Sequence, residues 1–222
     1  MIRAGKVFAR EQRVDKPGTP VSTELALEIR GKEHPWVSRG GMKLDHALHR
    51  FDIDVAGAAA LDIGASSGGF TDVLLTRGAG RVYAVDVGYG QLNWRLRSDE
   101  RVVVLERQNA RQLTADQIPE PVNIIVCDAS FIGLEKVLAT PLTFAAPGAH
   151  LAALIKPQFE VGKGEVGKGG IVRDPEQHRA VCNRIESWVS GLPGWQALGI
   201  DQSPINGAEG NIEFLIVARR ND

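Results

Sequence analysis

The chain has 222 residues, a formal net charge of −1, 43% hydrophobic residues and 24% charged residues. This composition predicts one ordinary globular domain with a substantial core and at most a small appendage. No apolar run approaches the roughly 18 residues that span a bilayer, so the sequence excludes a transmembrane helix. The charged N-terminus lacks the apolar centre of a signal peptide. We therefore expect a cytoplasmic protein without membrane attachment.

Cysteine content bears on disulfides and metal sites, and charge distribution bears on the binding partner. Cys127 and Cys182 are too few for a disulfide framework or a multi-cysteine metal site, so we expect two reduced thiols and no bound metal. Residues 1–50 hold 10 Lys and Arg against 6 Asp and Glu, whereas the remaining residues hold 16 against 21. A basic N-terminal segment ahead of an acidic body favours a small module that faces a polyanion such as nucleic acid.

The first 32 residues predict a small β-rich module. They contain a turn-like segment at 15–18 and a β-prone stretch at 25–29. Residues 33–56 are expected to form a linker and then a first helix that carries Lys43.

From residue 57 onward, short apolar runs alternate with longer amphipathic stretches. Continuous apolar runs predict strands of a parallel sheet that is covered on both faces, and the amphipathic stretches predict crossover helices. The expected strands are residues 58–63, 81–87, 102–105, 123–127, 151–155 and 212–218, and the expected helices lie near 70–78, 91–99, 133–146 and 174–191. This pattern indicates a doubly wound, mostly parallel α/β sheet over residues 57–222.

A glycine-rich turn follows the first of these strands, in the sequence LDIGASSGGF. Such a turn lets a ligand approach the backbone and the first N–H groups of the next helix. Ser66 stands where a dinucleotide-binding turn has its second glycine, which disfavours an NAD-dependent oxidoreductase. Asp62 before the turn suits the cationic amino-acid end of S-adenosylmethionine, and Asp86 after the second strand suits ribose hydroxyls. A tight turn with a helix-capping aspartate is the alternative interpretation.

Ionisable residues end two more strands, Asp128 after the fourth and Lys156 after the fifth. Ligands bind beyond the carboxyl ends of the strands in an open α/β sheet, so both side chains should face the crevice of Gly64 and Asp86. Taken singly, Asp128 could be a helix cap and Lys156 a surface lysine.

A segment with five glycines, residues 161–170, follows Lys156. We expect a flexible loop that can close over the site. Lys163 and Lys168 within it could contact phosphates.

Several motifs occur in the order typical of one known family: SRGGMKL, LDIGASSGGFTD, YAVDVGYGQ, CDASFI, LIKPQFE and GNIE. Through these motifs the chain resembles, from about residue 12 to residue 219, the TlyA or hemolysin A family of ribosomal RNA 2′-O-methyltransferases within the FtsJ-like class. The resemblance implies a Rossmann-like methyltransferase fold with S-adenosylmethionine as cofactor. It also implies that a ribose 2′-hydroxyl of ribosomal RNA, free or in ribosomal subunits, accepts the methyl group.

The resemblance implies a catalytic tetrad that falls on Lys43, Asp128, Lys156 and Glu213. Around the cofactor we expect Asp62, Gly64, Ser66, Ser67, Gly68, Gly69, Phe70, Asp86, Asn109, Ala110 and Asp128. Toward the RNA we expect Arg39, Lys43, Arg107, Arg111, Lys163 and Lys168.

Within this tetrad we expect Lys156 to be the base, because partial burial and the nearby charge of Lys43 both favour a neutral amine. Asp128 would orient Lys156, and Glu213 would hold Lys43 or the ribose.

Family members open with an alpha-L type RNA-binding domain in which two helices precede a β-turn portion. Residues 1–7 resemble only the later half of that domain, so we expect residues 1–32 to be a partial, truncated RNA-binding module. One alternative is an RNA-binding protein that keeps cofactor binding but lacks productive RNA docking. Another is a membrane-active hemolysin, which the absence of a long basic amphipathic helix disfavours. The sequence indicates neither the methylated nucleotide nor the oligomeric state.

Overall fold

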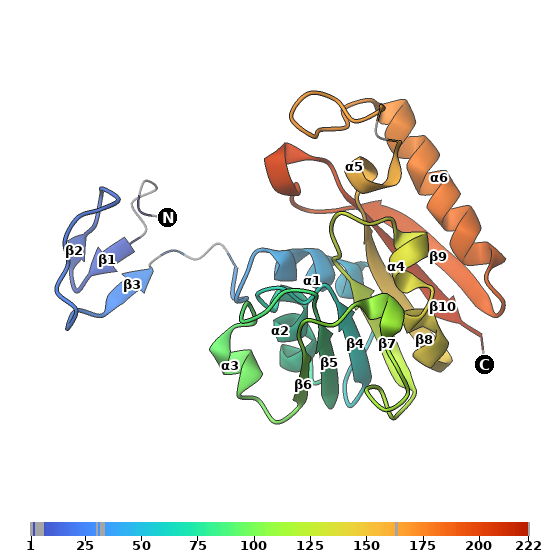
Figure 1. Ribbon diagram of the computed structural model, residues 1–222, viewed down its shortest axis with the longest axis horizontal. Helices are drawn as coiled ribbons and strands as arrows, with labels where there is room; N and C mark the ends of the chain where they lie inside the picture. Colours follow the sequence, from blue (N-terminus) through green and yellow to red (C-terminus); the bar gives the residue numbers. More distant parts are fainter. Residues whose placement is uncertain (1, 3–6, 30, 32–33, 163, 222) are drawn as a thin grey trace. The chain divides into compact units, whose positions relative to one another are not determined.

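The computed structural model describes residues 2, 7–29, 31, 34–162 and 164–221, which form two compact units, Met1–Pro35 and Trp36–Asp222 (Figure 1). The first unit contains a small antiparallel sheet in the order β2-β1-β3. Its strands are β1 (Val7–Ala9), β2 (Gln12–Arg13) and β3 (Leu27–Ile29). Strand β3 lies within the stretch that the sequence predicts to be β-prone.

The second unit is built on a seven-stranded sheet in the order β6-β5-β4-β7-β8-β10-β9. The strands are β4 (Ala59–Ile63), β5 (Arg81–Val85), β6 (Val102–Leu105), β7 (Val122–Cys127), β8 (Ala145–Ile155), β9 (Trp195–Gln202) and β10 (Phe214–Arg220). The strands from β4 to β8 are parallel, and β10 pairs antiparallel with both β8 and β9. The predicted doubly wound, mostly parallel sheet is confirmed.

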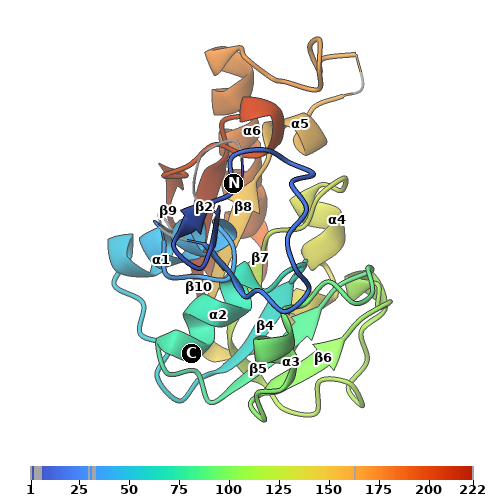
Figure 2. The same ribbon diagram turned by 90° about the vertical axis from the view of Figure 1, so that its left-hand side faces the viewer.

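Helices cover both faces of this sheet (Figures 1 and 2). On one face lie α1 (Gly40–Arg50), α2 (Gly69–Thr76) and α3 (Trp94–Arg97), and on the other lie α4 (Leu134–Leu138) and α6 (Pro175–Gly191). Strand side chains alternate between the faces, so Leu61 and Ile63 join the core under α4 and α6 while Ala60 joins the core under α1 and α2. The continuous apolar runs of the sequence are explained by these two cores.

Strand β9 is absent from the sequence prediction. Its sequence, WQALGIDQ, mixes polar and apolar residues, and the strand forms the edge of the sheet. An antiparallel edge strand is buried on one side only, so it lacks the continuous apolar run that marks the parallel strands. Helix α6 supplies the apolar partners of β9.

Two predicted helices are shorter in the structure. The stretch near 91–99 yields only α3, and the stretch near 133–146 yields α4 and then a 3-10 turn at Pro141–Phe144. Pro141 has no backbone N–H to donate to a helical hydrogen bond, so α4 does not continue through it and a 3-10 turn follows.

Helix α1 belongs to the second unit, which begins at Trp36, whereas the sequence predicts a domain boundary at residue 57. Leu44, Ala47 and Leu48 of α1 are buried in the core shared with α2. The Arg77 side chain at the end of α2 also donates a hydrogen bond of 2.7 Å to Asp45. These contacts hold α1 against the sheet and fix the position of the helix that carries Lys43.

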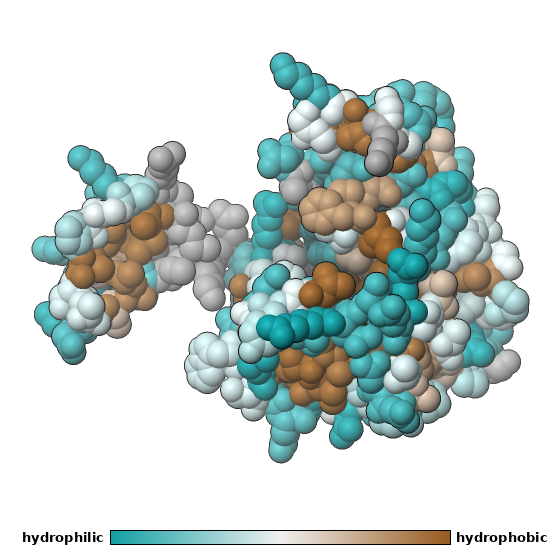
Figure 3. Space-filling view, in the orientation of Figure 1, coloured by the Kyte–Doolittle hydropathy of each residue, from teal (hydrophilic) through white to brown (hydrophobic). Residues whose placement is uncertain are grey.

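The surface of the second unit exposes several large apolar side chains, among them Val87, Tyr89, Trp94, Phe131 and Leu198. Figure 3 shows hydrophobic patches scattered among hydrophilic residues on the face that it presents. Across the described part of the chain, no helix combines the length and apolarity that crossing a membrane requires.

Candidate active site

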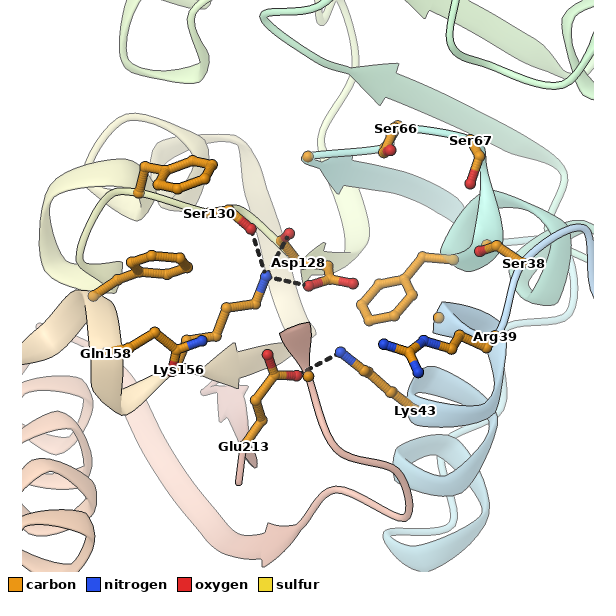
Figure 4. Close-up of a pocket in the computed structure, with 18 residues that line it drawn as sticks. Ser38, Arg39, Lys43, Ser66, Ser67, Asp128, Ser130, Lys156, Gln158 and Glu213 are labelled. Atoms are coloured by element: carbon orange, nitrogen blue, oxygen red, sulfur yellow. Dashed lines mark hydrogen bonds and ion pairs between the residues drawn. The ribbon is translucent and has the colours of Figure 1, made fainter. Parts of the chain in front are cut away.

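The carboxyl ends of neighbouring parallel strands bring the predicted site residues together. Gly64 follows β4, Asp128 follows β7 and Lys156 follows β8, while α1 contributes Lys43 and the segment before β10 contributes Glu213. Figure 4 shows the four ionisable side chains around one cavity of about 310 Å³. We call this the tetrad cavity. Its position agrees with the rule that ligands bind beyond the carboxyl ends of strands in an open α/β sheet.

Lys43 and Glu213 form one of two ion pairs in the tetrad cavity. The Lys43 Nζ lies 2.5 Å from Glu213 Oε2, and the two side chains are 8% and 3% exposed. Removing one partner of a buried ion pair leaves an uncompensated charge, so each of these residues depends on the other. The pair connects α1 to the start of β10.

Lys156 forms the second ion pair with Asp128. Its Nζ lies 2.6 Å from Asp128 Oδ1 and donates further hydrogen bonds to the Asp128 carbonyl oxygen at 3.1 Å and to Ser130 Oγ at 2.9 Å (Figure 4). The three contacts direct the ammonium group at the segment that follows β7. The sequence predicts Lys43 as the charged neighbour of Lys156, whereas in the structure the ion-pair partner of each lysine is a carboxylate.

Glu160, at the end of α5 (Pro157–Glu160), joins the segment after β7 to the segment that follows Lys156. Its side chain is 4% exposed, accepts a hydrogen bond of 2.7 Å from the Leu134 N–H and forms a 2.6 Å ion pair with Arg184 of α6. Gly133 leaves space for this carboxylate, because a Cβ there would lie 3.1 Å from Glu160 Oε2. The segment after β7 and the segment after β8 are therefore joined independently of Lys156.

A second cavity of about 460 Å³ adjoins the tetrad cavity, and we call it the strand-end cavity. The two cavities share the lining residues Gly64, Ser66, Asp128, Ser130 and Phe131. Asp86, Asn109 and Ala110 line only the strand-end cavity. Together the cavities form one crevice with two compartments.

The glycine-rich turn between β4 and α2 lines both compartments. Gly64 has φ +83°, and a Cβ at this position would lie 2.9 Å from the Ala129 backbone nitrogen, so only glycine fits. Asp86 supports the turn, since its Oδ2 accepts the Ser66 N–H at 2.8 Å and its Oδ1 accepts the Gly88 N–H at 2.7 Å. Each carboxylate oxygen can accept a second hydrogen bond from a ligand.

Asp62 lies beneath this turn and lines neither cavity. It is 0% exposed, its Oδ2 accepts a 2.6 Å hydrogen bond from the Thr71 hydroxyl, and its Oδ1 has no hydrogen-bond partner. Burial raises the pKa of Asp62 to about 7, the Thr71 hydrogen bond opposes the rise, and the nearby charges of Asp128 and Asp86 add to it. Direct contact between Asp62 and a ligand stays a prediction.

Most of the predicted site residues line one of the two cavities. Those of the tetrad cavity are Arg39, Lys43, Gly64, Ser66, Ser67, Gly69, Phe70, Asp128, Lys156 and Glu213, and those of the strand-end cavity are Gly64, Ser66, Asp86, Asn109, Ala110 and Asp128. Asp62, Gly68, Arg107, Arg111 and Lys168 line neither. Gly68 packs instead against α3, where a Cβ would lie 2.2 Å from Leu96 Cδ1. Lys163 lies outside the described residues.

Sequence reasoning missed several residues that line the tetrad cavity, among them Ser38, Ser130, Gln158, Phe159 and Gly207. Ser130 and Gln158 stand two residues after Asp128 and Lys156 in the motifs CDASFI and LIKPQFE, so those motifs contained a usable signal. No comparable signal marks Gly207. Its importance comes from its proximity to Glu213, because a Cβ there would lie 1.9 Å from Glu213 Oε1.

Comparison with known proteins identifies the class of protein that this fold and crevice define, the Rossmann-like methyltransferases. An O-methyltransferase from Bacillus cereus, solved in complex with SAH, shares the fold at a TM-score of 0.55 and 20% identity, over 83% of this chain and 82% of that one. The chain belongs to the FtsJ-like methyltransferase family, whose model matches residues 36–220. The predicted resemblance is thereby confirmed.

Individual relatives match nearly the whole chain. The Mycobacterium tuberculosis protein named 16S/23S rRNA (cytidine-2′-O)-methyltransferase TlyA is 49% identical over 220 residues, which cover 99% of this chain and 82% of that protein. Hemolysin A of Brachyspira hyodysenteriae is 39% identical over 218 residues, 97% of this chain and 89% of that protein. The structure of a proposed hemolysin from Streptococcus thermophilus has a TM-score of 0.86 and 40% identity, over 100% of this chain and 81% of that one.

Replacing Gly207 tests whether the Lys43–Glu213 pair needs its present position. In Gly207→Ala the new Cβ would collide with the Glu213 carboxylate, which must then move away from Lys43. We expect turnover to fall about 10–100-fold, as it does for other small displacements of site groups. Tm should change only slightly. Gly191→Ala is the control, because a Cβ at Gly191 meets nothing within 4 Å. Equal activity of the two variants would contradict this role of Gly207.

Replacing Asp62 with Asn tests whether burial raises the pKa of the Asp62 side chain in the folded protein. Folded wild-type protein keeps the Asp62 proton up to about pH 7, whereas the unfolded chain releases it near pH 3.8. The unfolded state thus binds fewer protons than the folded state in this window. The free energy of unfolding that Asp62 contributes at low pH is therefore lost as pH rises through about 7. The loss amounts to at most about 1.4 kcal/mol per pH unit. Urea unfolding without ligand should show the stability of Asp62→Asn rising relative to wild type between about pH 5 and about pH 8. A difference that is independent of pH would refute the shifted pKa.

Proposed function

We propose that this protein transfers a methyl group from S-adenosylmethionine to a ribose 2′-hydroxyl of ribosomal RNA. The observation that carries the proposal is the convergence of two lysine–carboxylate pairs on one compartment of a crevice whose other compartment lies beside a glycine-rich turn. The name of the M. tuberculosis relative, at 49% identity, supports the same reaction and substrate. A ribosomal substrate would place the protein in the cytoplasm.

The strand-end cavity has the chemistry that S-adenosylmethionine needs. Asp86 offers acceptor oxygens for ribose hydroxyls, Asn109 and Ala110 would lie against the adenine, and the shared residues Gly64 and Ser66 would approach the amino-acid end. Carboxylates near this crevice favour a cationic ligand. The unpartnered Oδ1 of buried Asp62 is a further acceptor beneath the turn. When bound, S-adenosylmethionine supplies an electrophilic methyl group.

The tetrad residues would hold and deprotonate the ribose. We assign Lys156 as the acceptor of the 2′-hydroxyl proton, which requires its amine to be neutral when the ribose is bound. Asp128 and Ser130 fix the direction of this amine through their contacts with Nζ. Lys43, held by Glu213, would bind the ribose or an adjacent phosphate. Positioning of this kind can supply about 7–11 kcal/mol of the barrier reduction in well-oriented reactions.

The RNA would approach over basic side chains around the crevice. Arg39 is exposed and lines the tetrad cavity, while Arg107 lies over the Tyr89 ring at 4.2 Å and is also exposed. Arg111 and Lys168 add exposed positive charge. We assign the unit within Met1–Pro35 to RNA binding as well, in keeping with the basic N-terminal part of the sequence. Such contacts strengthen binding through phosphate neutralisation.

The direct test is transfer of labelled methyl from S-adenosylmethionine to 30S and 50S ribosomal subunits that lack 2′-O-methylation. Wild-type protein should place the label on a 2′-O-methyl nucleoside, and Lys156→Ala should lower turnover by about 100-fold or more, since general-base catalysis contributes about that factor. Lys136→Ala, an exposed lysine on α4, is the control and should keep full activity.

Binding of S-adenosylhomocysteine, measured in parallel, separates the possible failures. Normal turnover by Lys156→Ala would refute the assignment of the base. Cofactor binding by wild-type protein without transfer to either subunit would favour a protein that lacks productive RNA docking. Absence of both binding and transfer would refute the methyltransferase proposal.

A further inference from the structure

The side chain of Gln158 is a polar group of the tetrad cavity that the proposed mechanism leaves unused. Gln158 lies in α5, two residues after Lys156, and lines the cavity beside Lys156 (Figure 4). Its Oε1 is buried and has no hydrogen-bond partner. Among the described residues, only His34 Nδ1 and Asp62 Oδ1 share this condition. Of the three side chains, that of Gln158 is the one that lines the tetrad cavity or the strand-end cavity.

A buried amide oxygen without a partner lowers stability, because this oxygen has lost its bonds to water and gained none in return. An apolar side chain of the same length, such as methionine, would avoid this cost. Native proteins satisfy nearly all of their buried polar groups, so an exception inside a functional cavity points to a ligand that completes the hydrogen bonds.

Gln158 is not needed to hold α5 in place. The Glu160 carboxylate fastens the end of this helix to the Leu134 N–H and to Arg184, and Pro157 at its start is buried. The backbone also closes on itself, since the Phe159 N–H donates to the Lys156 carbonyl at 2.8 Å. The amide is therefore free to serve a ligand without a structural duty.

The position of Gln158 distinguishes between the two ligands of the proposed reaction. It lines the compartment of Lys43, Lys156 and Glu213, and it does not line the strand-end cavity with Asp86 and Asn109. The compartment beside the tetrad is the one that must receive the nucleotide to be methylated. Rotation about the terminal torsion presents either the amide oxygen or the amide nitrogen, so the group can accept from or donate to a nucleotide.

We propose that Gln158 is a substrate-binding residue whose side-chain amide hydrogen-bonds the target nucleotide of the RNA in the tetrad cavity. This inference rests on the proposed function. It adds a contact beside Lys156, on the side of the cavity away from Lys43 (Figure 4). A nucleotide held from both sides would present its 2′-hydroxyl to Lys156 with less freedom.

The test is Gln158→Met in the full chain, with three measurements: kcat/KM for methyl transfer to 30S and 50S subunits that lack 2′-O-methylation, Kd for S-adenosylhomocysteine, and Tm. We expect kcat/KM to fall about tenfold, the worth of one or two lost hydrogen bonds. The Kd should stay within about twofold, and Tm should be unchanged or higher because an unpaired buried oxygen has been removed.

Asn123→Leu is the matched control for an amide with a structural duty. Asn123 Oδ1 accepts a hydrogen bond of 3.0 Å from the Ala59 N–H where β4 and β7 begin, at the edge of the sheet opposite the crevice. Its replacement should lower Tm and leave kcat/KM unchanged. Gln158→Met is thus expected to lower kcat/KM without lowering Tm, whereas Asn123→Leu is expected to lower Tm without changing kcat/KM.

Three results would overturn the inference: kcat/KM of Gln158→Met within about twofold of wild type, a loss of Tm like that of Asn123→Leu, or weakened binding of S-adenosylhomocysteine. Wild-type protein that binds S-adenosylhomocysteine but methylates neither subunit would favour a protein that lacks productive RNA docking, and it would overturn the proposed transfer to ribosomal RNA and the inference with it. The wild-type reaction, run alongside, keeps these two failures distinct.

Discussion

The ion pair between Lys156 and Asp128 joins the ends of two neighbouring parallel strands, and the rest of the site is arranged around it. Because β7 and β8 run in the same direction, both side chains emerge at the same edge of the sheet, 2.6 Å apart. The Glu160 carboxylate holds the following segments together, so the pair does not have to do so. The Lys156 amine is thereby positioned by a rigid frame and by its own contacts with Asp128 and Ser130.

Close backbone approach is the second constraint on this crevice. The glycine-rich turn passes so near Ala129 that a Cβ at Gly64 has no space, and the turn before β10 passes so near Glu213 that a Cβ at Gly207 has none either. At Gly64 the absence of a Cβ leaves space for the Ala129 backbone nitrogen, and at Gly207 it leaves space for the Glu213 carboxylate. The family match over residues 36–220 covers both turns, so both belong to the methyltransferase unit.

The crevice is also where the protein gives up stability. Asp62 is fully buried with an unpartnered oxygen and a pKa raised to about 7, and Gln158 carries an unpartnered amide oxygen beside the tetrad. An apolar residue in place of Gln158 would remove the cost of its unpartnered oxygen. Gln158 lines the tetrad cavity, which is consistent with a ligand that completes its interactions, whereas Asp62 lies beneath the glycine-rich turn.

The sequence by itself determined the features that depend on neighbours along the chain: the continuous apolar runs of the parallel strands, the glycine-rich turn after β4, and the placement of Asp128 and Lys156 at strand ends. Tertiary structure alone decided the edge strand β9, the packing of α1 within the second unit and the burial of Asp62 away from both cavities. The motif resemblance named Lys43 and Glu213, but they stand 170 residues apart, and no local pattern predicts that they pair at 2.5 Å. Local periodicity reports which face of an element is buried, whereas contacts between distant segments arise only when the two helix layers close over the sheet.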